Sequence, residues 1–333
     1  MDEKILIIGL GLIGRQRLDA CLEFGIKPNN IYAFDPSISQ LSFVKEPAYV
    51  HICFVDNLKA ISEIKFARAV VAVPHDIATT LVVALLDEGT KVLLEKPLGR
   101  NIQEAQELAS HPHSSNLSIG FNYRFMPGVI ALKKVLDSQV LGKISTLKME
   151  LGHGGGPKDQ GSWKLDPVRA GGGVVLDPGI HLIDLLVYLF DATEKNTSVR
   201  GRTEWKGFWN TGIDESSLFI GYVDTTPFSI SSSIVAWRTR FRIEVIGTER
   251  YFEIDGRGRS DGPQSITEGQ KWGWLSSTSQ KSSEQFSELA IKDDSLLEET
   301  FAWLVGSEAV CNIDQALQGM KIYTQVIESQ NEQ

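Results

Sequence analysis

Apolar runs alternate with helix-like segments through residues 4–121. In the helix-like segments apolar residues recur every three or four positions, as at Leu18, Cys21 and Leu22. Strands that are apolar on both faces occur mainly in parallel sheets that helices cover. This alternation therefore predicts a doubly wound parallel sheet. Its strands are expected at residues 4–8, 31–34, 50–55, 67–73, 91–94 and 117–121.

A different pattern follows residue 122, where apolar and polar positions alternate one by one. Strands with one buried and one solvated face are typical of antiparallel sheets. The second half is therefore predicted to contain a predominantly antiparallel sheet. Its clearest strands are residues 147–151, 230–236 and 241–245.

Two segments of the second half are rich in glycine or in small polar residues. Residues 152–173 begin with Gly152-His-Gly-Gly-Gly and end with Gly171-Gly-Gly173, which predicts a long loop, and such loops are usually functional or mobile. Residues 255–283 are predicted to be an irregular excursion whose large anchors are Trp272 and Trp274. Helices are expected near residues 178–190, from 296 and from 313.

Several helix starts are marked by residues that accept hydrogen bonds from free backbone N–H groups. Asn101 and Glu104 have the spacing of a capping box. Pro178 suits the first turn of a helix, which makes Asp177 the expected N-cap before it. The other expected caps are Asp56, Asp76 and Asn312.

Length, charge and cysteine content limit the class of protein. The chain has 333 residues, which favours two domains because single cores stop growing at about 250 to 300 residues. The formal net charge of −9 argues against a nucleic-acid partner. No apolar run approaches the roughly 20 residues that span a bilayer, and acidic residues precede the first apolar run, so we expect no membrane association. Three separated cysteines without C-x-x-C spacing indicate a reducing, cytoplasmic location.

A glycine-rich turn joins the first predicted strand to the first helix. Its sequence is Gly9-Leu-Gly11-Leu-Ile-Gly14. The first glycine permits a tight turn, the second lets backbone N–H groups approach a pyrophosphate, and the third lets helix and strand pack closely. The turn therefore predicts a dinucleotide site made by Gly9, Gly11, Leu12, Ile13 and Gly14.

Asp35 ends the second predicted strand, about 20 residues beyond the glycine turn, where the ribose-binding acid of such a unit belongs. A carboxylate accepts hydrogen bonds from ribose hydroxyls and repels a 2'-phosphate, and no basic residue follows in Pro36-Ser-Ile-Ser. NAD is therefore the expected cofactor, and NADP is disfavoured. The alternative is that Asp35 only begins an Asp-Pro turn.

The strand predicted at residues 91–94 stops abruptly at Glu95-Lys96-Pro97. In an open parallel sheet, ligands bind beyond the carboxyl ends of the strands. Glu95 and Lys96 are therefore predicted at the mouth of a cleft. The alternative is an exposed ion pair that ends a strand and contributes little.

Four motifs follow one another along the chain. Three of them are the glycine turn, Glu95-Lys96-Pro97 and Gly120-Phe-Asn122-Tyr-Arg124-Phe. The fourth is Gly171-Gly-Gly-Val-Val-Leu-Asp177-Pro-Gly-Ile-His181-Leu-Ile-Asp184. In this order they resemble the glucose-fructose oxidoreductase, inositol dehydrogenase and MocA (Gfo/Idh/MocA) family, and the likeness covers nearly the whole chain.

The resemblance implies two domains. Residues 1–121 would form an NAD-binding Rossmann domain with a doubly wound parallel sheet. Residues 122–333 would form an α/β domain with a large, predominantly antiparallel open sheet, which binds substrate and joins copies of the chain into a homodimer or homotetramer. Whether the C-terminal helix packs back on the first domain stays open.

The resemblance also implies the residues of the site. Lys96 and His181 would lie beside the reacting carbon, Asp177 would hold the substrate hydroxyl, and Glu95 would lie near the nicotinamide or its ribose. Many members have an Asn after Pro74 and a His three residues further on, whereas this chain has His75 and Ala78. Further cofactor contacts are expected from Val73, Pro74, His75 and Asn122, and further substrate contacts from Tyr123, Arg124, His153 and Trp163.

Hydride transfer from a carbinol carbon requires a base that takes the hydroxyl proton. Asp177 and His181 are four residues apart, so they would be neighbours if both lie in one helical turn. A helix N-terminus keeps His181 neutral, and a positive nicotinamide disfavours the ammonium form of Lys96. The primary acceptor stays open between the two, with Lys96 favoured and His181 in a relay. No metal is needed, and the His and Cys spacing fits no zinc site.

The sequence thus predicts an NAD-dependent oxidoreductase that acts on a CH–OH group of a sugar, nucleotide sugar or cyclitol. One alternative is a catalytically silent NAD(H)-binding regulator. Another is a glycosidase that acts by transient oxidation with tightly held NAD. For the site itself, the structural alternatives are Asp177 as a helix cap and His181 as a packed histidine bonded to Asp184. The sequence does not specify the substrate, because fold-level likeness transfers chemistry better than ligand identity.

Overall fold

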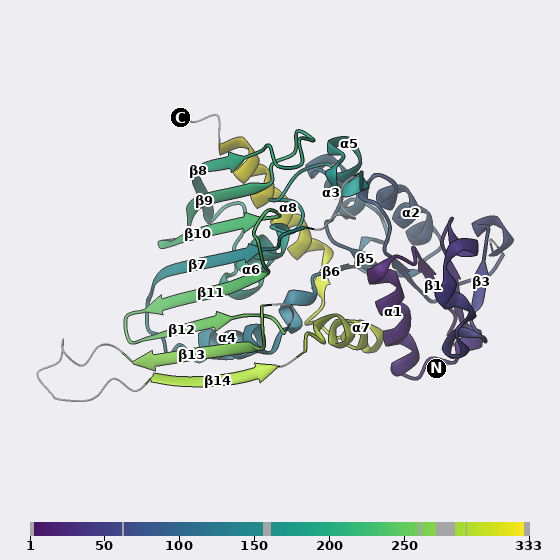
Figure 1. The fold of residues 1–333 in the computed structure, drawn as a ribbon, viewed down its shortest axis with the longest axis horizontal. Helices are drawn as coiled ribbons and strands as arrows, with labels where there is room; N and C mark the ends of the chain where they lie inside the picture. The colour runs from purple at the N-terminus through teal and green to yellow at the C-terminus, as the bar shows by residue number, and fades with distance from the viewer. Residues whose placement is uncertain are drawn as a thin grey trace, which may run out of the picture. The chain divides into compact units, whose positions relative to one another are not determined.

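A computed structural model describes residues 3–61, 63–155, 161–258, 261–270, 284–290 and 292–329. The chain forms two compact units, each with its own sheet (Figure 1). The first unit contains residues up to 122 together with 296–317. The second contains residues 123–295 and those from 318 onward.

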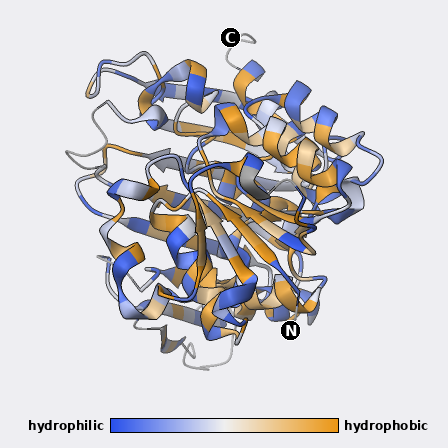
Figure 2. Cartoon of the chain, turned by 90° about the vertical axis from the view of Figure 1, so that its right-hand side faces the viewer, coloured by the Kyte–Doolittle hydropathy of each residue, from blue (hydrophilic) through white to orange (hydrophobic). Residues whose placement is uncertain are grey.

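The first unit is built on a seven-stranded sheet. All neighbouring strands run parallel except at one edge, where β15 is antiparallel to β6. The inner strand β1 is completely buried, and Figure 2 shows the strands at the centre of this view as mostly hydrophobic. The order across the sheet is β15 (Cys311–Asn312), β6 (Leu117–Gly120), β5 (Lys91–Glu95), β4 (Arg68–Val71), β1 (Ile5–Ile8), β2 (Ile31–Phe34) and β3 (Cys53–Val55).

Three helices connect parallel strands of this sheet: α1 (Leu12–Glu23), α2 (His75–Asp87) and α3 (Ile102–Ala109). The edge strand β15 is preceded by α7 (Ser295–Val305) and followed by α8 (Ile313–Glu328). The Asn101 side chain accepts a 3.0 Å hydrogen bond from Glu104 N, and Asn312 accepts one of 3.0 Å from Gln315 N, so both predicted caps are confirmed.

Two of the predicted caps in this unit are wrong. The helix α2 begins one residue after Pro74, so Asp76 lies inside its first turn instead of before it. After β3 the acceptor is Asn57, whose Oδ1 lies 2.9 Å from Lys59 N, and not Asp56. Pro74 is the N-cap of α2, and Asn57 supplies the capping side chain after β3.

The second unit contains an eight-stranded sheet. Its neighbours are antiparallel except β7 and β10, which run parallel. Together with the first sheet this confirms the predicted fold class. The order is β14 (Glu284–Ala290), β13 (Gln264–Gln270), β12 (Arg250–Asp255), β11 (Arg240–Gly247), β7 (Ile144–Gly152), β10 (Thr226–Ser233), β9 (Ser216–Val223) and β8 (Thr197–Trp205).

The helices α4 (Pro127–Asp137), α5 (Pro167–Ala170) and α6 (Ile180–Phe190) belong to the second unit. Nine of the eleven residues of α6 are buried, as expected for a helix that is apolar on nearly every side. The remaining helical turns of the chain are 3-10 helices at Pro28–Asn30, Ile38–Gln40, Ser42–Lys45, Pro47–Tyr49, Leu58–Ile61, Ser114–Asn116, Asn122–Phe125 and Trp163–Leu165.

The predicted irregular excursion over residues 255–283 is only partly correct. Residues 264–270 form β13, which pairs with β12 in regular antiparallel register. The sequence of β13 shows little alternation of apolar and polar residues, because both faces of this strand are mainly polar. Trp272 and Trp274 lie outside the described residues. Among the helices that the structure describes, none has the length and apolar content needed to cross a membrane.

Candidate active site

The glycine turn after β1 fits a dinucleotide. Gly9 has φ of +90°, and a Cβ there would lie 2.2 Å from Ala72 O. A Cβ on Gly14 would lie 1.8 Å from Gly9 O, so neither position accepts a side chain. At Gly11 a Cβ would meet nothing within 4 Å. This open face lies at the N-terminus of α1, where free backbone N–H groups bind phosphate oxygens.

Asp35 follows β2 directly and is fixed by two backbone donors. Its Oδ2 accepts a 2.8 Å hydrogen bond from Leu10 N, and its Oδ1 accepts one of 2.8 Å from Ser37 N. A carboxylate has about four acceptor positions. The Asp35 carboxylate therefore retains acceptor capacity for ribose hydroxyls while its orientation is set by the turn.

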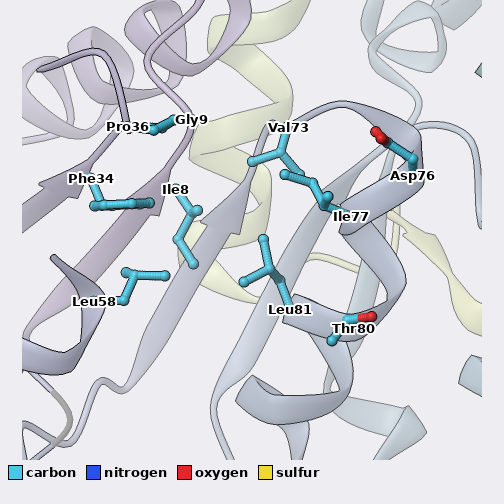
Figure 3. A pocket seen from close by; sticks show the side chains of 10 residues that line it. All are labelled: Ile8, Gly9, Phe34, Pro36, Leu58, Val73, Asp76, Ile77, Thr80 and Leu81. Atoms are coloured by element: carbon cyan, nitrogen blue, oxygen red, sulfur yellow. The ribbon is translucent and has the colours of Figure 1, made fainter. Parts of the chain in front are cut away.

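A pocket of about 330 Å³ lies between the ends of β1 and β2 and the start of α2 (Figure 3). The strands β1 and β4 are neighbours from which the strand order runs in opposite directions, and dinucleotides bind at such a switch point. Asp76 and Thr80 are the polar side chains of the lining. Its apolar side chains come from Ile8, Phe34, Pro36, Leu58, Val73, Ile77 and Leu81.

The other predicted cofactor residues of this unit lie near the strand ends. Pro74 precedes α2 and His75 is its first residue, with a side chain that is buried. Lys96 follows the last residue of β5 directly. Asn122 begins the 3-10 helix that ends the first unit.

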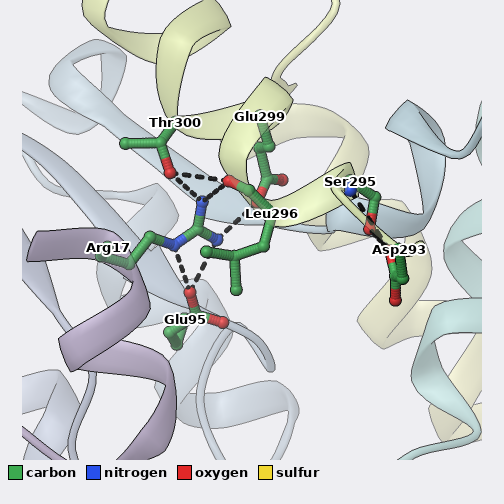
Figure 4. A network of polar contacts seen from close by, with 7 residues as sticks. All are labelled: Arg17, Glu95, Asp293, Ser295, Leu296, Glu299 and Thr300. Carbon is green, nitrogen blue, oxygen red and sulfur yellow. Dashed lines mark hydrogen bonds and ion pairs between the residues drawn. The ribbon is translucent and has the colours of Figure 1, made fainter. Parts of the chain in front are cut away.

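Glu95, the last residue of β5, is held by an arginine that the sequence analysis missed. Glu95 Oε1 accepts a 2.8 Å hydrogen bond from Arg17 Nε (Figure 4). Arg17 also donates to Glu299 Oε2 at 2.5 Å and to Thr300 Oγ1 at 2.8 Å, both on α7. Burial by itself lowers the pKa of the Arg17 guanidinium, but the charges of Glu95 and Glu299 outweigh it and raise that pKa above its ordinary value.

In the second unit the structure corrects the predicted role of Asp177 as a helix cap. The helix α6 begins at Ile180, with Gly179 as its N-cap. Asp177 therefore lies before the helix and does not share a helical turn with His181. Its Oδ2 instead accepts a 3.0 Å hydrogen bond from Lys164 Nζ, in a partly exposed ion pair.

His181 is the second residue of α6 and is 5% exposed. Its ring stacks on Tyr123 with the centroids 4.0 Å apart and an angle of 8° between the planes. Arg257 donates a hydrogen bond to the Tyr123 hydroxyl. Arg257 thus holds the tyrosine of the stacked pair. No sequence motif identifies Arg257, because it follows β12 and lies outside the four motifs quoted above.

Arg124, predicted to border the substrate cleft, is 2% exposed. Its Nε and Nη2 donate to the two carboxylate oxygens of Asp184 at 2.8 and 2.6 Å. The guanidinium also lies 4.8 Å from the ring centroid of Tyr188. In this arrangement Arg124 anchors α6 through a bidentate buried pair.

The remaining predicted substrate residues lie on the glycine-rich loop. His153 Nδ1 accepts a 3.1 Å hydrogen bond from Gly155 N. Trp163 is half-buried, and Lys164 Nζ lies 5.8 Å from its ring centroid. Residues 156–160 of this loop lie outside the described residues. No cluster of three or more His, Cys, Asp or Glu in the described part of the chain is arranged for a metal ion.

Two glycines of the motif before Asp177 are required by packing. A Cβ on Gly173 would lie 2.3 Å from Asp214 Oδ1, and a Cβ on Gly172 would lie 2.6 Å from the Tyr323 hydroxyl. Val174 N donates to Asp214 O at 2.8 Å, which ties the turn to the same residue. The glycines therefore let the segment that carries Asp177 pack directly on Asp214 and Tyr323.

Two family models match this chain. Residues 3–123 match the oxidoreductase family with an NAD-binding Rossmann fold, and residues 129–253 match the Gfo/Idh/MocA C-terminal domain. The chain belongs to the Gfo/Idh/MocA family of oxidoreductases. Its first unit is accordingly an NAD-binding Rossmann fold, and the residues of the glycine turn and the pocket fit that cofactor.

Known relatives include dehydrogenases of sugars and cyclitols. Glucose-6-phosphate 3-dehydrogenase of Bacillus subtilis is 27% identical over 75% of this chain and 74% of its own length. The scyllo-inositol 2-dehydrogenase (NAD(+)) of the same organism is 23% identical over 74% of this chain and 72% of its own length. Two further relatives, each 31% identical, are matched over only 39% and 52% of their own lengths.

Solved structures share the fold. Levoglucosan dehydrogenase in complex with NADH has a TM-score of 0.81 and 16% identity, with 99% of this chain and 97% of that chain covered. UDP-N-acetylglucosamine 3-dehydrogenase of Acidithiobacillus ferrooxidans has a TM-score of 0.75 and 16% identity, with 98% and 97% covered.

The packing of Tyr323 predicts a loss of stability at alkaline pH. Burial, with a contribution from Asp214, raises the pKa of Tyr323 from 10.0 to about 12. The folded state therefore keeps the phenol proton that the unfolded chain loses, and this stabilisation is complete below pH 10 and disappears as the pH rises to about 12. We expect wild type to lose about 2 to 3 kcal/mol more than Tyr323→Phe across this range in urea unfolding.

Tyr32→Phe, at a partly exposed tyrosine of β2, is the control and should follow wild type. Identical losses in Tyr323→Phe and wild type would show that the Tyr323 phenol has no part in the alkaline transition.

Proposed function

We propose that the protein is an NAD-dependent oxidoreductase that transfers a hydride between nicotinamide and a hydroxyl-bearing carbon of a sugar, nucleotide sugar or cyclitol. The observation that carries this proposal is the end of β5, where Glu95 is the last residue of a strand with a buried middle and Lys96 follows it, in an NAD-binding unit. The relatives named above act on substrates of this class.

NAD, when bound, accepts or supplies the hydride. The protein must supply the groups that hold the substrate hydroxyl and move its proton. In the proposal Lys96 lies on the reacting hydroxyl, His181 relays the proton, and Asp177 accepts a hydrogen bond from a substrate hydroxyl. The position of His181 in the first turn of α6 supports a neutral imidazole, because the helix N-terminus disfavours its cationic form.

The stack of Tyr123 on His181 supports the relay role further. Stacking fixes the plane of the imidazole, and the bond from Arg257 fixes the tyrosine. A proton relay requires such fixed geometry, because transfer occurs only between atoms within hydrogen-bond reach.

Replacement of Lys96 tests the catalytic assignment. Lys96→Met should bind NADH within a few-fold of wild type, whereas turnover should fall by about 100-fold or more because the proton acceptor is lost. Turnover is followed by NADH absorbance with the substrate that wild type oxidises best in a panel of sugars, sugar phosphates and inositols. Lys91→Met, at the exposed opposite end of β5, is the matched control and should retain turnover.

The same assay separates the rival functions. A wild-type protein that binds NADH but oxidises no member of the panel would favour the silent regulator. Product release from a glycoside, with NADH remaining at the enzyme concentration, would favour the glycosidase. Full turnover by Lys96→Met would remove Lys96 from the mechanism.

Asp35 supports NAD as the preferred cofactor, because its fixed carboxylate suits ribose hydroxyls and repels a 2'-phosphate. Asp35→Ser should raise the Kd for NADH by about tenfold and lower the ratio of NADPH Kd to NADH Kd. Fluorescence titration with both cofactors measures this ratio. Asp56→Asn, an exposed change in the same unit, should leave it unaltered, and an unaltered ratio in Asp35→Ser would exclude Asp35 as the selecting residue.

We also infer that the eight-stranded sheet joins copies of this chain into a homodimer or homotetramer. Leu218, Ile220 and Tyr222 alternate along β9 and are 47, 50 and 42% exposed, so they form an apolar stripe on one face of the sheet. Ile220→Glu should shift the sedimentation of the protein toward the monomer, whereas Val50→Glu, an exposed apolar position in the first unit, should not. A monomeric wild type would refute the inference.

A further inference from the structure

Arg17 is a charged side chain enclosed in the interior of the first unit. It is 0% exposed, and it reaches from α1 to the carboxyl end of β5 and to α7. An unpaired charge at such a site would be very costly, so the arginine depends on its carboxylate partners. Glu299, which is also 0% exposed, satisfies one side of the guanidinium from α7.

Glu95 is the second carboxylate that binds Arg17, and unlike Glu299 it lies at the edge of the interior. Its side chain is 16% exposed. Its Oε1 is bound by Arg17, whereas Figure 4 shows its second oxygen directed away from the guanidinium. Among the residues that the structure describes, none forms a hydrogen bond with this second oxygen. One oxygen of Glu95 is thus anchored by Arg17, and the other remains able to accept a hydrogen bond.

The backbone of the neighbouring strand leaves space for the contact between Arg17 and Glu95. A Cβ on Gly120 would lie 2.9 Å from Arg17 Nη2 and 3.1 Å from Glu95 Oε1. Gly120 is paired with Glu95 in the register of β5 and β6. The absence of a side chain on the neighbouring strand therefore leaves room for the Arg17–Glu95 contact, which explains the glycine in Gly120-Phe-Asn122.

We propose that Arg17 is a positioning residue for the nicotinamide riboside half of the cofactor: it anchors one oxygen of Glu95 so that the other receives a hydrogen bond from that half. This rests on the proposed function, which assigns the end of β5 to the nicotinamide. The segment 295–305, distant in sequence, contributes by supplying Glu299, the second anion that keeps the guanidinium in place.

Two probes separate this role from a general structural one. ADP contains the adenosine and diphosphate of the cofactor but lacks the nicotinamide riboside. Arg17→Met should raise the Kd for NADH by about tenfold, the size expected for one charge-assisted hydrogen bond, and leave the Kd for ADP within about twofold. Glu95→Gln should give the same selective loss for NADH, because the amide presents a weaker acceptor. Isothermal titration calorimetry measures both constants.

Arg17→Met removes the guanidinium that pairs with the buried Glu299, so it is expected to lower stability and could prevent folding. The double variant Arg17→Met/Glu299→Leu removes both interior charges and should recover stability, since apolar replacements of buried ion pairs are often tolerated. Its affinity for NADH should nevertheless remain weak, because Glu95 is still not anchored.

The matched control is Arg68→Met. Arg68 also contacts α7, where it lies 5.6 Å from the ring centroid of Trp303, but it starts β4 at the amino end of the sheet. This variant should change thermal stability without changing the Kd for NADH or for ADP.

Three results would overturn the proposal: equal weakening of NADH and ADP in the Arg17 variants, recovery of NADH affinity together with stability in the double variant, or unchanged NADH affinity in Glu95→Gln. None of these depends on turnover. A failure of the catalytic assignment, seen as full turnover in Lys96→Met, is therefore distinguishable from a failure of the role of Arg17.

Discussion

The buried contact between Arg17 and its two carboxylates connects the three parts of the first unit that are most separated in sequence. Arg17 lies on α1, Glu95 ends β5, and Glu299 comes from α7. Removal of one member of a buried ion pair costs about 3 to 5 kcal/mol, because the remaining charge is left in a medium that cannot solvate it. The helix α7 follows the second sheet in sequence but belongs to the first unit. The position of Glu95 at the end of β5 therefore depends, through Arg17, on a residue of α7.

The second unit repeats this scheme with different residues. Arg124 binds both oxygens of Asp184 and fixes the helix that carries His181, just as Arg17 fixes the residue before Lys96. In each unit a buried guanidinium binds a carboxylate that is close in sequence to a proposed proton-transfer residue: Glu95 precedes Lys96, and Asp184 lies three positions after His181. Arginine suits this role because it remains charged when buried and binds carboxylates with a rigid fork. The two buried ion pairs thus hold Glu95, at the end of β5, and α6, the helix that carries His181.

Local signals explain what could be predicted from the sequence. The glycine turn, the strand that ends at Asp35 and the caps at Asn101 and Asn312 depend on contacts within a few residues, and each leaves a pattern in the chain. The partners of Glu95 leave none, because Arg17 and Glu299 are separated from it by 78 and 204 positions, the differences between the residue numbers. The same limit applies to Arg257, whose relation to Tyr123 is purely tertiary.

The correction at Asp177 changes the chemistry available to the site. A helix cap has one carboxylate oxygen committed to backbone N–H groups, and its release would destabilise the helix by about 1 kcal/mol. Asp177 is not the cap of α6, and its ion pair with Lys164, whose side chain is 52% exposed, is of a kind that contributes at most about 1 kcal/mol in solvent. In the proposed function, a substrate hydroxyl that took the place of the Lys164 ammonium would leave the start of α6, with its glycine N-cap, unchanged.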